Sequence, residues 1–348
     1  MKIFSSLLFL FSSLPCLCFA DRAEMNPDRT SEPPALCLNS FDYFNFSGMK
    51  KSPAGKALRE RIFYDLKISP DTEALIKNLN ENYALNVPES VERAVIAQFS
   101  LPGGGNFNTA EFKFSQKPGG QKSYVEGFFE KLSQRELSGV DSAGRHNSKK
   151  SATMCFGDQA SAFPPELAKN LPKAFLENTE YVSVAPMPPD TLIVIATAKT
   201  FSEIPKFRKT ESYIQTLACA SRPEILVYRQ FERRATEIAG LALSFPPGEF
   251  AITEKDDRIR IYVDFRCRDS QEAVFMEHFF LRFKLSLNQS AEKQPENVRA
   301  PLLSVGSSLS ISREDATLKL RIDCASKDFS AFLNWRSSWF PNPKKTKR

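Results

Sequence analysis

Hydrophobic and polar residues alternate most regularly between residues 258 and 267. The apolar positions are Ile259, Ile261, Val263 and Phe265, and the polar positions are Arg258, Arg260, Tyr262 and Asp264. A period of two predicts a strand that turns one face toward a core. Further strands in this half of the chain are predicted at residues 249–253, 308–312 and 317–323.

After the strand at 258–267, apolar residues recur at helical spacing. Asp269, with Glu272 three residues later, predicts a capped helix start, and the helix extends to about Leu287. Its apolar positions are Val274, Phe275, Phe279, Phe280 and Phe283. A polar loop is predicted at 288–299 and a short helix at 326–333.

The first half of the chain contains similar patterns. Ser52 and Pro53 predict a helix start, because Ser caps free amides and Pro is tolerated in the first turn. Strands are predicted at 93–99 and 109–114, on either side of the glycine-rich turn at 101–105, followed by a helix at 123–132. Three more strands are predicted at 152–156, 181–185 and 191–196.

Both halves therefore show two strands, a helix, a loop, two strands and a helix. This order predicts an α+β fold of two similar halves, each an antiparallel sheet with helices packed on one face. The first half covers residues 36–209, a helical connection covers 210–243, and the second half covers 244–335. The halves share element order and not residue identity, so chance recurrence is the alternative interpretation.

Residues 49–58 read Met-Lys-Lys-Ser-Pro-Ala-Gly-Lys-Ala-Leu. This stretch, with the element order that follows it, resembles uncharacterised secreted bacterial proteins in which an early Ser-Pro-x-Gly-x-x-Leu helix precedes two α+β repeats. The resemblance covers much of the chain in layout, and its only local motif is short. It implies a fold and an envelope address, and it assigns no catalytic residue.

The amino-terminal segment gives the clearest indication of location. Residues 1–20 begin with one Lys, continue with a Leu- and Phe-rich run and end in Ala20, which predicts a secretory signal peptide. The apolar run at 3–20 is also close to the length that spans a bilayer, so an uncleaved membrane anchor is the alternative. A flexible leader is predicted at 21–35 and a basic tail at 336–348. The mature protein is expected to be secreted or periplasmic.

The net charge and the cysteine content limit the partners, metal sites and disulfides that can be expected. The chain carries 47 basic and 41 acidic residues, a formal net charge of +6 that does not favour nucleic acid as a partner. Five cysteines follow the predicted signal peptide, without any Cys-x-x-Cys pair, and the chain has only 2 histidines. A zinc site is therefore not expected. Cys267 and Cys324 are the best candidates for a disulfide, and buried free thiols are the alternative.

No motif names a reaction, and we assign no catalytic, cofactor-binding or metal-binding residue. Cys155 follows His146 by nine residues, but its apolar neighbours are typical of a core thiol. The glycine-rich stretch after Leu101 lacks the Lys-Ser/Thr ending of a nucleotide-binding loop, and a strand follows it. We therefore expect it to be a hairpin tip.

The end of the chain carries the only candidate interaction surface. Aromatic and basic residues gather there as Trp335, Arg336, Trp339 and Phe340. An exposed cluster of this kind could contact a membrane interface or a partner groove, whereas a helix could instead pack the same aromatics against the second sheet.

Together these features favour a secreted or envelope-associated protein that acts as a non-enzymatic binding or structural module. The expected partner is an envelope or cell-surface protein, with peripheral membrane contact through the carboxyl-terminal end as a further option. The alternative is a hydrolase of unrecognised type that acts outside the cytoplasm. It requires a concave site in which two carboxylates or a Cys/His pair meet.

Overall fold

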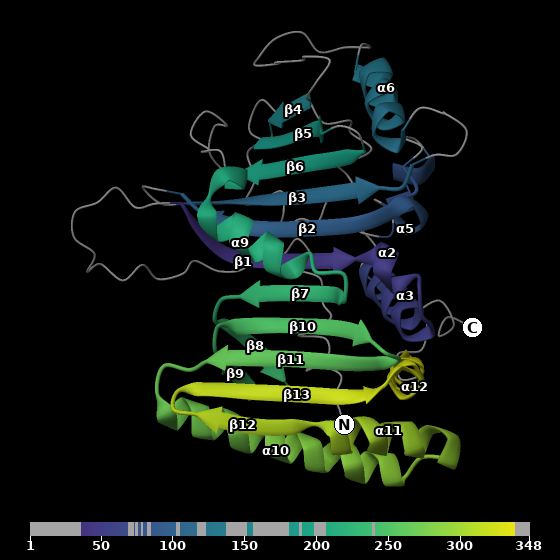
Figure 1. Ribbon diagram of the computed structural model, residues 1–348. Helices are drawn as coiled ribbons and strands as arrows, with labels where there is room; N and C mark the ends of the chain where they lie inside the picture. The colour runs from purple at the N-terminus through teal and green to yellow at the C-terminus, as the bar shows by residue number, and fades with distance from the viewer. Residues whose placement is uncertain are drawn as a thin grey trace, which may run out of the picture. The chain divides into compact units, whose positions relative to one another are not determined.

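The computed structural model describes residues 36–68, 73, 76–77, 79–81, 85–101, 105–116, 123–136, 152–155, 181–187, 190–197, 207–238 and 241–337 (Figure 1). The protein has an α+β fold in which strands pair antiparallel. It divides into two compact units. Of the described residues, unit 1 holds Asp42–Asp65 and those from Ala220 onward, and unit 2 holds those up to Phe41 and those between Leu66 and Cys219.

The sheet of unit 1 has the order β12-β13-β11-β10-β7. Its strands are β7 (Ile225–Phe231), β10 (Gly248–Lys255), β11 (Arg258–Arg266), β12 (Ser310–Glu314) and β13 (Thr317–Ala325). The β10–β11 hairpin closes through Asp256 and Asp257, both with positive φ (54° and 57°), as two-residue hairpin turns require. Asp315 takes the same conformation between β12 and β13 (φ 50°). Turn geometry therefore accounts for these carboxylates.

Helices cover the apolar face of this sheet. They are α2 (Phe46–Met49), α3 (Pro53–Ile68), α10 (Ser270–Glu292), α11 (Glu296–Ser308) and α12 (Ser326–Ser337). A separate hairpin, β8 (Arg234–Ile238) and β9 (Leu241–Phe245), contributes Phe245 to an aromatic cluster with Phe265 and Phe280. The alternation predicted for β11 is confirmed, because Ile259, Val263 and Phe265 are buried.

The predicted start of α10 is also confirmed. The Asp269 carboxylate accepts from the Glu272 amide at 2.8 Å, and the Glu272 carboxylate accepts from the Arg268 amide at 2.6 Å. These reciprocal bonds satisfy donors that a helix start otherwise leaves open.

The sheet of unit 2 has the order β2-β3-β6-β5-β4. Its elements are β2 (Val91–Ser100), β3 (Asn106–Phe114), β4 (Ala152–Cys155), β5 (Tyr181–Met187), β6 (Thr191–Thr197), the helices α5 (Val87–Ser90), α6 (Tyr124–Glu136) and α9 (Glu211–Ala220), and the 3-10 turn η3 (Phe207–Lys209). The predicted hairpin around the glycine-rich turn is confirmed, with the Leu101 amide donating to Gly105 at 2.8 Å.

The unit boundary passes through β1 (Cys37–Asn45), between Phe41 and Asp42. In unit 1, the Asn45 side chain donates to the Ile225 carbonyl at 3.2 Å. In unit 2, the Asn39 amide donates to the Ser100 hydroxyl at 2.6 Å. The protein is therefore not built from consecutive segments 36–209 and 244–335, because α2 and α3 fold with the later part of the chain. The prediction of two similar halves is not established by this architecture.

Two local predictions are wrong. The predicted loop at 288–299 is largely helical, because α10 extends to Glu292 and α11 begins at Glu296. The predicted helical connection at 210–243 contains only α9, followed by β7, β8 and most of β9. In β7 the apolar run Ile225, Leu226 and Val227 is buried, which favours a strand over a helix.

Residues 1–35 and 338–348 lie outside the described residues, so the predicted signal peptide, leader and most of the basic tail stay predictions. Within the described part of the chain, no helix is long and apolar enough to cross a bilayer.

Candidate functional site

Unit 1 contains an apolar pocket between its sheet and its helices. The pocket has a volume of about 90 Å³. Its described lining comes from β1, α3, β7, β10, β11, β13, α10 and α12, with Leu309 after α11, and it is apolar except for Arg61. Because an apolar cavity of about 150 Å³ holds one benzene molecule, this space is sized for roughly three or four carbon atoms. The pocket can therefore accept the apolar part of a small molecule.

Helix α3 supplies Leu58, Arg61 and Ile62 to this lining. Its start explains the Ser-Pro-x-Gly-x-x-Leu motif physically. The Ser52 hydroxyl accepts from the Gly55 amide at 2.9 Å, and Pro53 occupies the first helical position. A Cβ on Gly55 would lie 2.5 Å from the Met49 carbonyl oxygen, so α3 approaches the end of α2 too closely for a larger residue. The motif thus sets the direction of the helix that carries the pocket residues.

Glu254, at the end of β10, forms hydrogen bonds with residues at the starts of α3 and α12. Its carboxylate accepts from the Ser52 hydroxyl at 2.5 Å and from the Ser326 hydroxyl at 2.9 Å. Ser52 precedes α3 and Ser326 begins α12, and both helices line the pocket. A carboxylate beside two helix starts is also favourably placed relative to their dipoles. Glu254 therefore positions the lining without being part of it.

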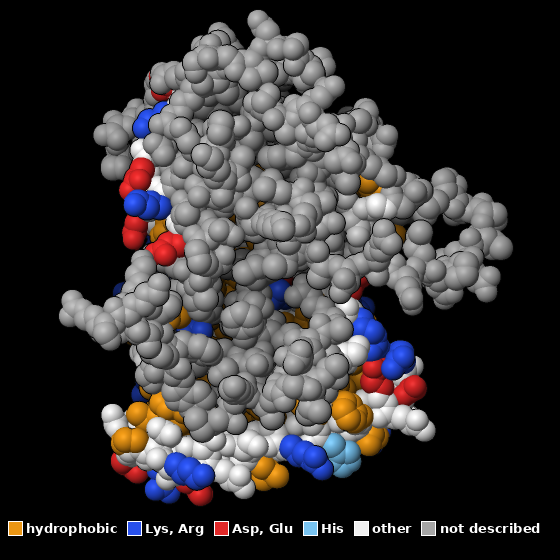
Figure 2. Space-filling model, turned by 180° about the vertical axis from the view of Figure 1, so that it is seen from behind, with side chains coloured by type: hydrophobic (Ala, Val, Ile, Leu, Met, Phe, Trp, Pro, Cys, Tyr) orange, Lys and Arg blue, Asp and Glu red, His pale blue; other side chains and the backbone are white. Residues whose placement is uncertain are grey.

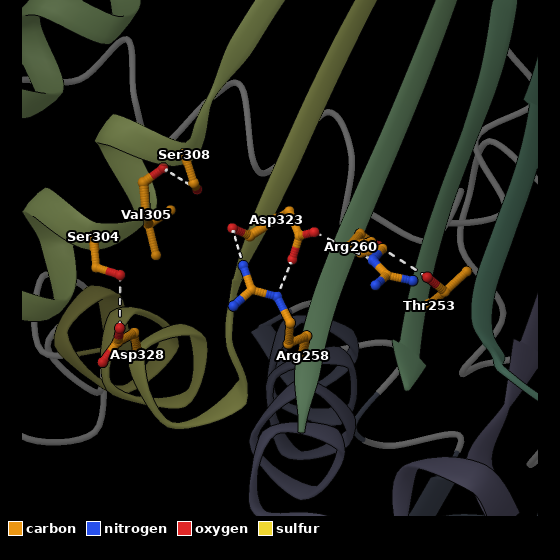
Figure 3. A network of polar contacts seen from close by, with 8 residues as sticks. All are labelled: Thr253, Arg258, Arg260, Ser304, Val305, Ser308, Asp323 and Asp328. Atoms are coloured by element: carbon orange, nitrogen blue, oxygen red, sulfur yellow. Dashed lines mark hydrogen bonds and ion pairs between the residues drawn. The ribbon is translucent and has the colours of Figure 1, made fainter. Parts of the chain in front are cut away.

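Arg258 and Arg260 of β11 alternate with its pocket-lining residues and meet Asp323 of β13 (Figure 3). The Arg258 guanidinium lies 2.5 Å from one Asp323 oxygen, and Arg260 lies 3.3 Å from the other. The hydrogen bond from Arg258 lowers the pKa of Asp323. All three side chains are at least a third exposed, so the cluster is a screened surface network with little effect on stability.

A second charged cluster joins the β7–β8 connection to α10. Arg233 forms a two-pronged ion pair with Glu272, with contacts of 2.5 and 3.0 Å. The hydrogen bond from Arg233 holds the pKa of Glu272 at about 2. Burial and the nearby Glu272 charge raise the pKa of the Cys267 thiol. The raised pKa disfavours a reactive thiolate at Cys267.

The predicted Cys267–Cys324 disulfide is wrong for this structure. Both residues are free thiols. Cys324 pairs with Ile259 at one end of β11, whereas Cys267 follows the opposite end of that strand. Eight residue steps along β11 correspond to roughly 27 Å, far beyond disulfide reach. Burial of Cys324 raises its pKa to about 12, as in an inert core thiol.

The predicted aromatic surface at the end of the chain is only partly described. Trp335 is buried on α12, where it packs against Phe332 with ring centroids 6.2 Å apart. Its indole N–H donates to the Gln294 side chain at 3.4 Å. Trp335 therefore packs into unit 1, as the alternative interpretation expected. The Arg336 side chain, Trp339 and Phe340 lie outside the described residues, as do His146 and the Cys155 side chain.

Helix α10 bears an apolar stripe on its outer surface. Phe275, Leu281 and Leu285 are 57%, 43% and 61% exposed. Figure 2 shows separate hydrophobic side chains along the lower edge, with Lys and Arg side chains, a histidine and other residues between them. The helical spacing of the apolar residues predicts this helix but does not distinguish the buried Phe280 from the exposed Phe275.

Unit 2 contains a buried polar network between α9 and its sheet. The Tyr213 hydroxyl on α9 donates to the Glu111 carboxylate on β3 at 2.7 Å, and Arg208 lies 3.1 Å from the same oxygen. Burial and the Glu111 charge raise the pKa of Tyr213, which stays neutral. The ring also packs against Phe41 and Phe99. The network fastens α9 to the sheet.

Sequence reasoning missed Arg61, the only charged residue in the described lining of the pocket. A signal was present, because Arg61 shares the helical face of Ala54, Ala57, Leu58 and Ile62. A charged residue in the middle of an apolar helix face is uncommon and indicates a special environment. The pocket itself had no signal, since its walls come from distant parts of the chain.

Comparison with known proteins gives only distant matches. No protein-family model and no curated protein sequence matches the chain. In structure it is similar to TP0453 in crystal form III, with a TM-score of 0.38 and 9% identity over 86% of this chain and 95% of that one. Crystal form I gives 0.33 and 8% over 86% and 94%, and form IV gives 0.33 and 9% over 85% and 93%.

Proposed function

We propose that the protein is a non-enzymatic binding module of the cell envelope or the secreted fraction, and that the unit 1 pocket binds the apolar part of a small molecule. The pocket carries this proposal. A concave, nearly apolar surface with one polar group is the usual form of a small-molecule site, and such cavities bind apolar guests without polar chemistry.

The composition of the lining favours binding over hydrolysis. Its described side chains are Phe, Leu, Ile, Val and one Arg, which include no nucleophile and no group suited to exchange protons near neutral pH. Among the described residues, no cluster of three or more His, Cys, Asp or Glu side chains is arranged to hold a metal ion. A hydrolase would need its reacting groups elsewhere.

Ligand-observed NMR with toluene tests this proposal on the mature chain, residues 21–348. Toluene is apolar, and its methyl end is small enough to enter the pocket. Leu58→Phe should fill part of the space and abolish toluene binding, because added volume in a packed site excludes the guest. Leu281→Phe, on the exposed stripe of α10, is the matched control and should leave binding unchanged.

Far-UV circular dichroism must show that both variants are folded. Toluene binding that survives Leu58→Phe, or that is absent in the wild-type protein, would contradict the proposal.

The proposed location in the cell envelope or the secreted fraction needs a separate test. Amino-terminal sequencing by mass spectrometry of protein from the cells that make it should find Asp21 as the first residue, in the envelope or the culture medium. A mature chain that starts at Met1 would favour the uncleaved anchor. An envelope protein partner stays a prediction.

A further inference from the structure

Two cationic side chains of unit 2 lie directly opposite each other on neighbouring strands. Arg93 of β2 pairs in register with Lys113 of β3, and Lys113 pairs on its other side with Thr191 of β6. Directly opposite side chains have Cβ atoms roughly 4.5–5.5 Å apart, and like charges at this distance destabilise a sheet. No ion pair joins either cation to another residue in the part of the chain that the structure describes. The fold therefore keeps an unfavourable charge pair at this position.

The same face of the sheet carries the buried network of unit 2. Glu111 lies two residues before Lys113 on β3, so both side chains project from one face. The Glu111 carboxylate accepts from the Tyr213 hydroxyl at 2.7 Å, and Arg208 lies 3.1 Å from the same oxygen. Burial and the Glu111 charge raise the pKa of Tyr213, whereas the charges of Arg208 and Arg93 oppose this rise. Arg93 is therefore close enough for its charge to act on the network.

Arg208 brings a third cation to the row of Arg93 and Lys113. Its Nη1 atom lies 2.5 Å from the Met187 sulfur, and Met187 pairs in register with Thr191, the neighbour of Lys113. The Arg208 side chain is 39% exposed, and Arg93 and Lys113 are half-buried. Solvent and small solutes can therefore reach the three cations.

These cations outnumber the carboxylates around them. In the row of Lys113 and the next row, which contains Glu111, Glu111 is the only acidic residue on the strands β2, β3, β6 and β5. The buried carboxylate of Asp190 belongs to the opposite face, because Asp190 accepts from the Phe114 amide, one step along the ladder from Lys113. The cluster therefore has an excess of two positive charges.

We infer that Arg93, Lys113 and Arg208 bind a phosphoryl dianion, either as free phosphate or as a phosphate monoester. A phosphoryl group carries a charge of about −1.5 to −2 at pH 7 and has three strong acceptor oxygens. Guanidinium groups bind two such oxygens at once, and a lysine adds a point charge. Glu111 holds Arg208 in place and does not contact the anion. This site lies in unit 2 and is independent of the function proposed for the unit 1 pocket.

Isothermal titration calorimetry with inorganic phosphate and with glycerol 3-phosphate tests the inference on the mature chain, residues 21–348. At low ionic strength and about pH 7.5, both probes are dianions. At least one of them should bind with a dissociation constant of about 1 mM or lower. The stronger of the two shows whether the cluster prefers the free ion or the monoester.

Arg93→Gln and Lys113→Gln should each weaken this binding about tenfold or more, as expected when one charge-assisted contact is lost. Lys255→Gln removes the same charge from an exposed position on β10 of unit 1 and should leave binding within about twofold. Because the two cations of unit 2 repel each other, Arg93→Gln and Lys113→Gln should unfold at or above the wild-type temperature without phosphate. Phosphate at about 10 mM should raise the unfolding temperature of the wild type more than that of either variant.

Absence of binding by both probes would overturn the inference and leave the pocket proposal intact. An equal loss of affinity in Lys255→Gln would also overturn it, because the effect would then come from net charge. Lower unfolding temperatures of both unit 2 variants without phosphate would assign Arg93 and Lys113 a structural role and contradict the inference as well.

Discussion

The two units bury charge in different ways. In unit 1, Asp42 and Arg229 form an ion pair in which each residue is 3% exposed, and Arg61 lines an apolar pocket. In unit 2, Glu111 is equally buried, but it meets a neutral Tyr213 and the Arg208 side chain, which is 39% exposed. The cation that pairs with Glu111 in unit 2 is therefore partly exposed to solvent, whereas Arg61 and Arg229 of unit 1 are buried.

This difference does not come from strand pairing. Neighbouring strands follow the order β10-β11-β13-β12 in unit 1 and β2-β3-β6-β5 in unit 2. In both units, the second strand of one hairpin therefore pairs with the second strand of a later hairpin. The interiors differ because of the helices and their side chains. Unit 1 adds the long α10 and α11, and α3 brings Arg61 to the apolar face.

The largest effect on stability is expected when the two buried carboxylates, Asp42 and Glu111, are removed. Asp42→Ala should lower the free energy of unfolding of unit 1 by about 3–5 kcal/mol, because it leaves Arg229 as a buried charge without its carboxylate. Glu111→Ala should cost unit 2 only about 1–3 kcal/mol, since Arg208 reaches water and mainly the Tyr213 hydroxyl loses a partner. Urea unfolding followed by hydrogen exchange of peptides from β7 and β3 measures both. Equal losses of unfolding free energy in the two variants would show that the buried ion pair of unit 1 is no more important for stability than the network of unit 2.

Two helical glycines, Gly306 in unit 1 and Gly127 in unit 2, test how tightly the helices of each unit are packed. A Cβ on Gly306 of α11 would lie 2.3 Å from the Asn288 side-chain oxygen, so Gly306→Ala should destabilise unit 1 by about 1–3 kcal/mol. A Cβ on Gly127 of α6 meets nothing within 4 Å, so Gly127→Ala should stabilise unit 2 by about 0.5–1 kcal/mol. Thermal unfolding of the two variants gives the signs. A neutral Gly306→Ala would mean that the Asn288 side chain moves aside.

Glu272 makes part of the stability of unit 1 dependent on pH. Its pKa is lowered to about 2, so the Arg233 pair stabilises the folded state above the ordinary pKa of Glu and is lost as pH falls from about 4.5 to 2. Glu272→Gln keeps the helix-capping acceptor and removes the charge. The variant should be less stable by on the order of 2 kcal/mol at pH 7, with the difference disappearing near pH 2. Urea unfolding across this range checks the prediction, and a constant difference would contradict it.

The smallest effect is expected on the outer surface of α10. Replacing Phe275 and Leu285 together by Ser should change stability by less than about 0.5 kcal/mol per site, because both side chains are more than half exposed. Trp335 fluorescence during urea unfolding reports on unit 1, where this residue is buried. A larger loss would show that the stripe is covered in the intact protein.

The sequence alone determined the local elements whose periodicity reflects burial on one side. β11 alternates because one of its faces is buried and the other carries Arg258, Arg260 and Tyr262. The starts of α3 and α10 were visible because capping depends on residues close in sequence, such as Ser52 and Asp269. The paired aspartates at 256–257 likewise follow local turn geometry.

Only the tertiary structure decided how distant segments combine. The pocket needs α3, five strands and two later helices, and no local pattern encodes their meeting. The same holds for the Asp42–Arg229 pair, 187 residues apart, and for the separation of Cys267 from Cys324, which depends on strand register. Local sequence specifies backbone preference and which face is apolar, whereas long-range packing decides which buried side chains pair and which segments line a cavity.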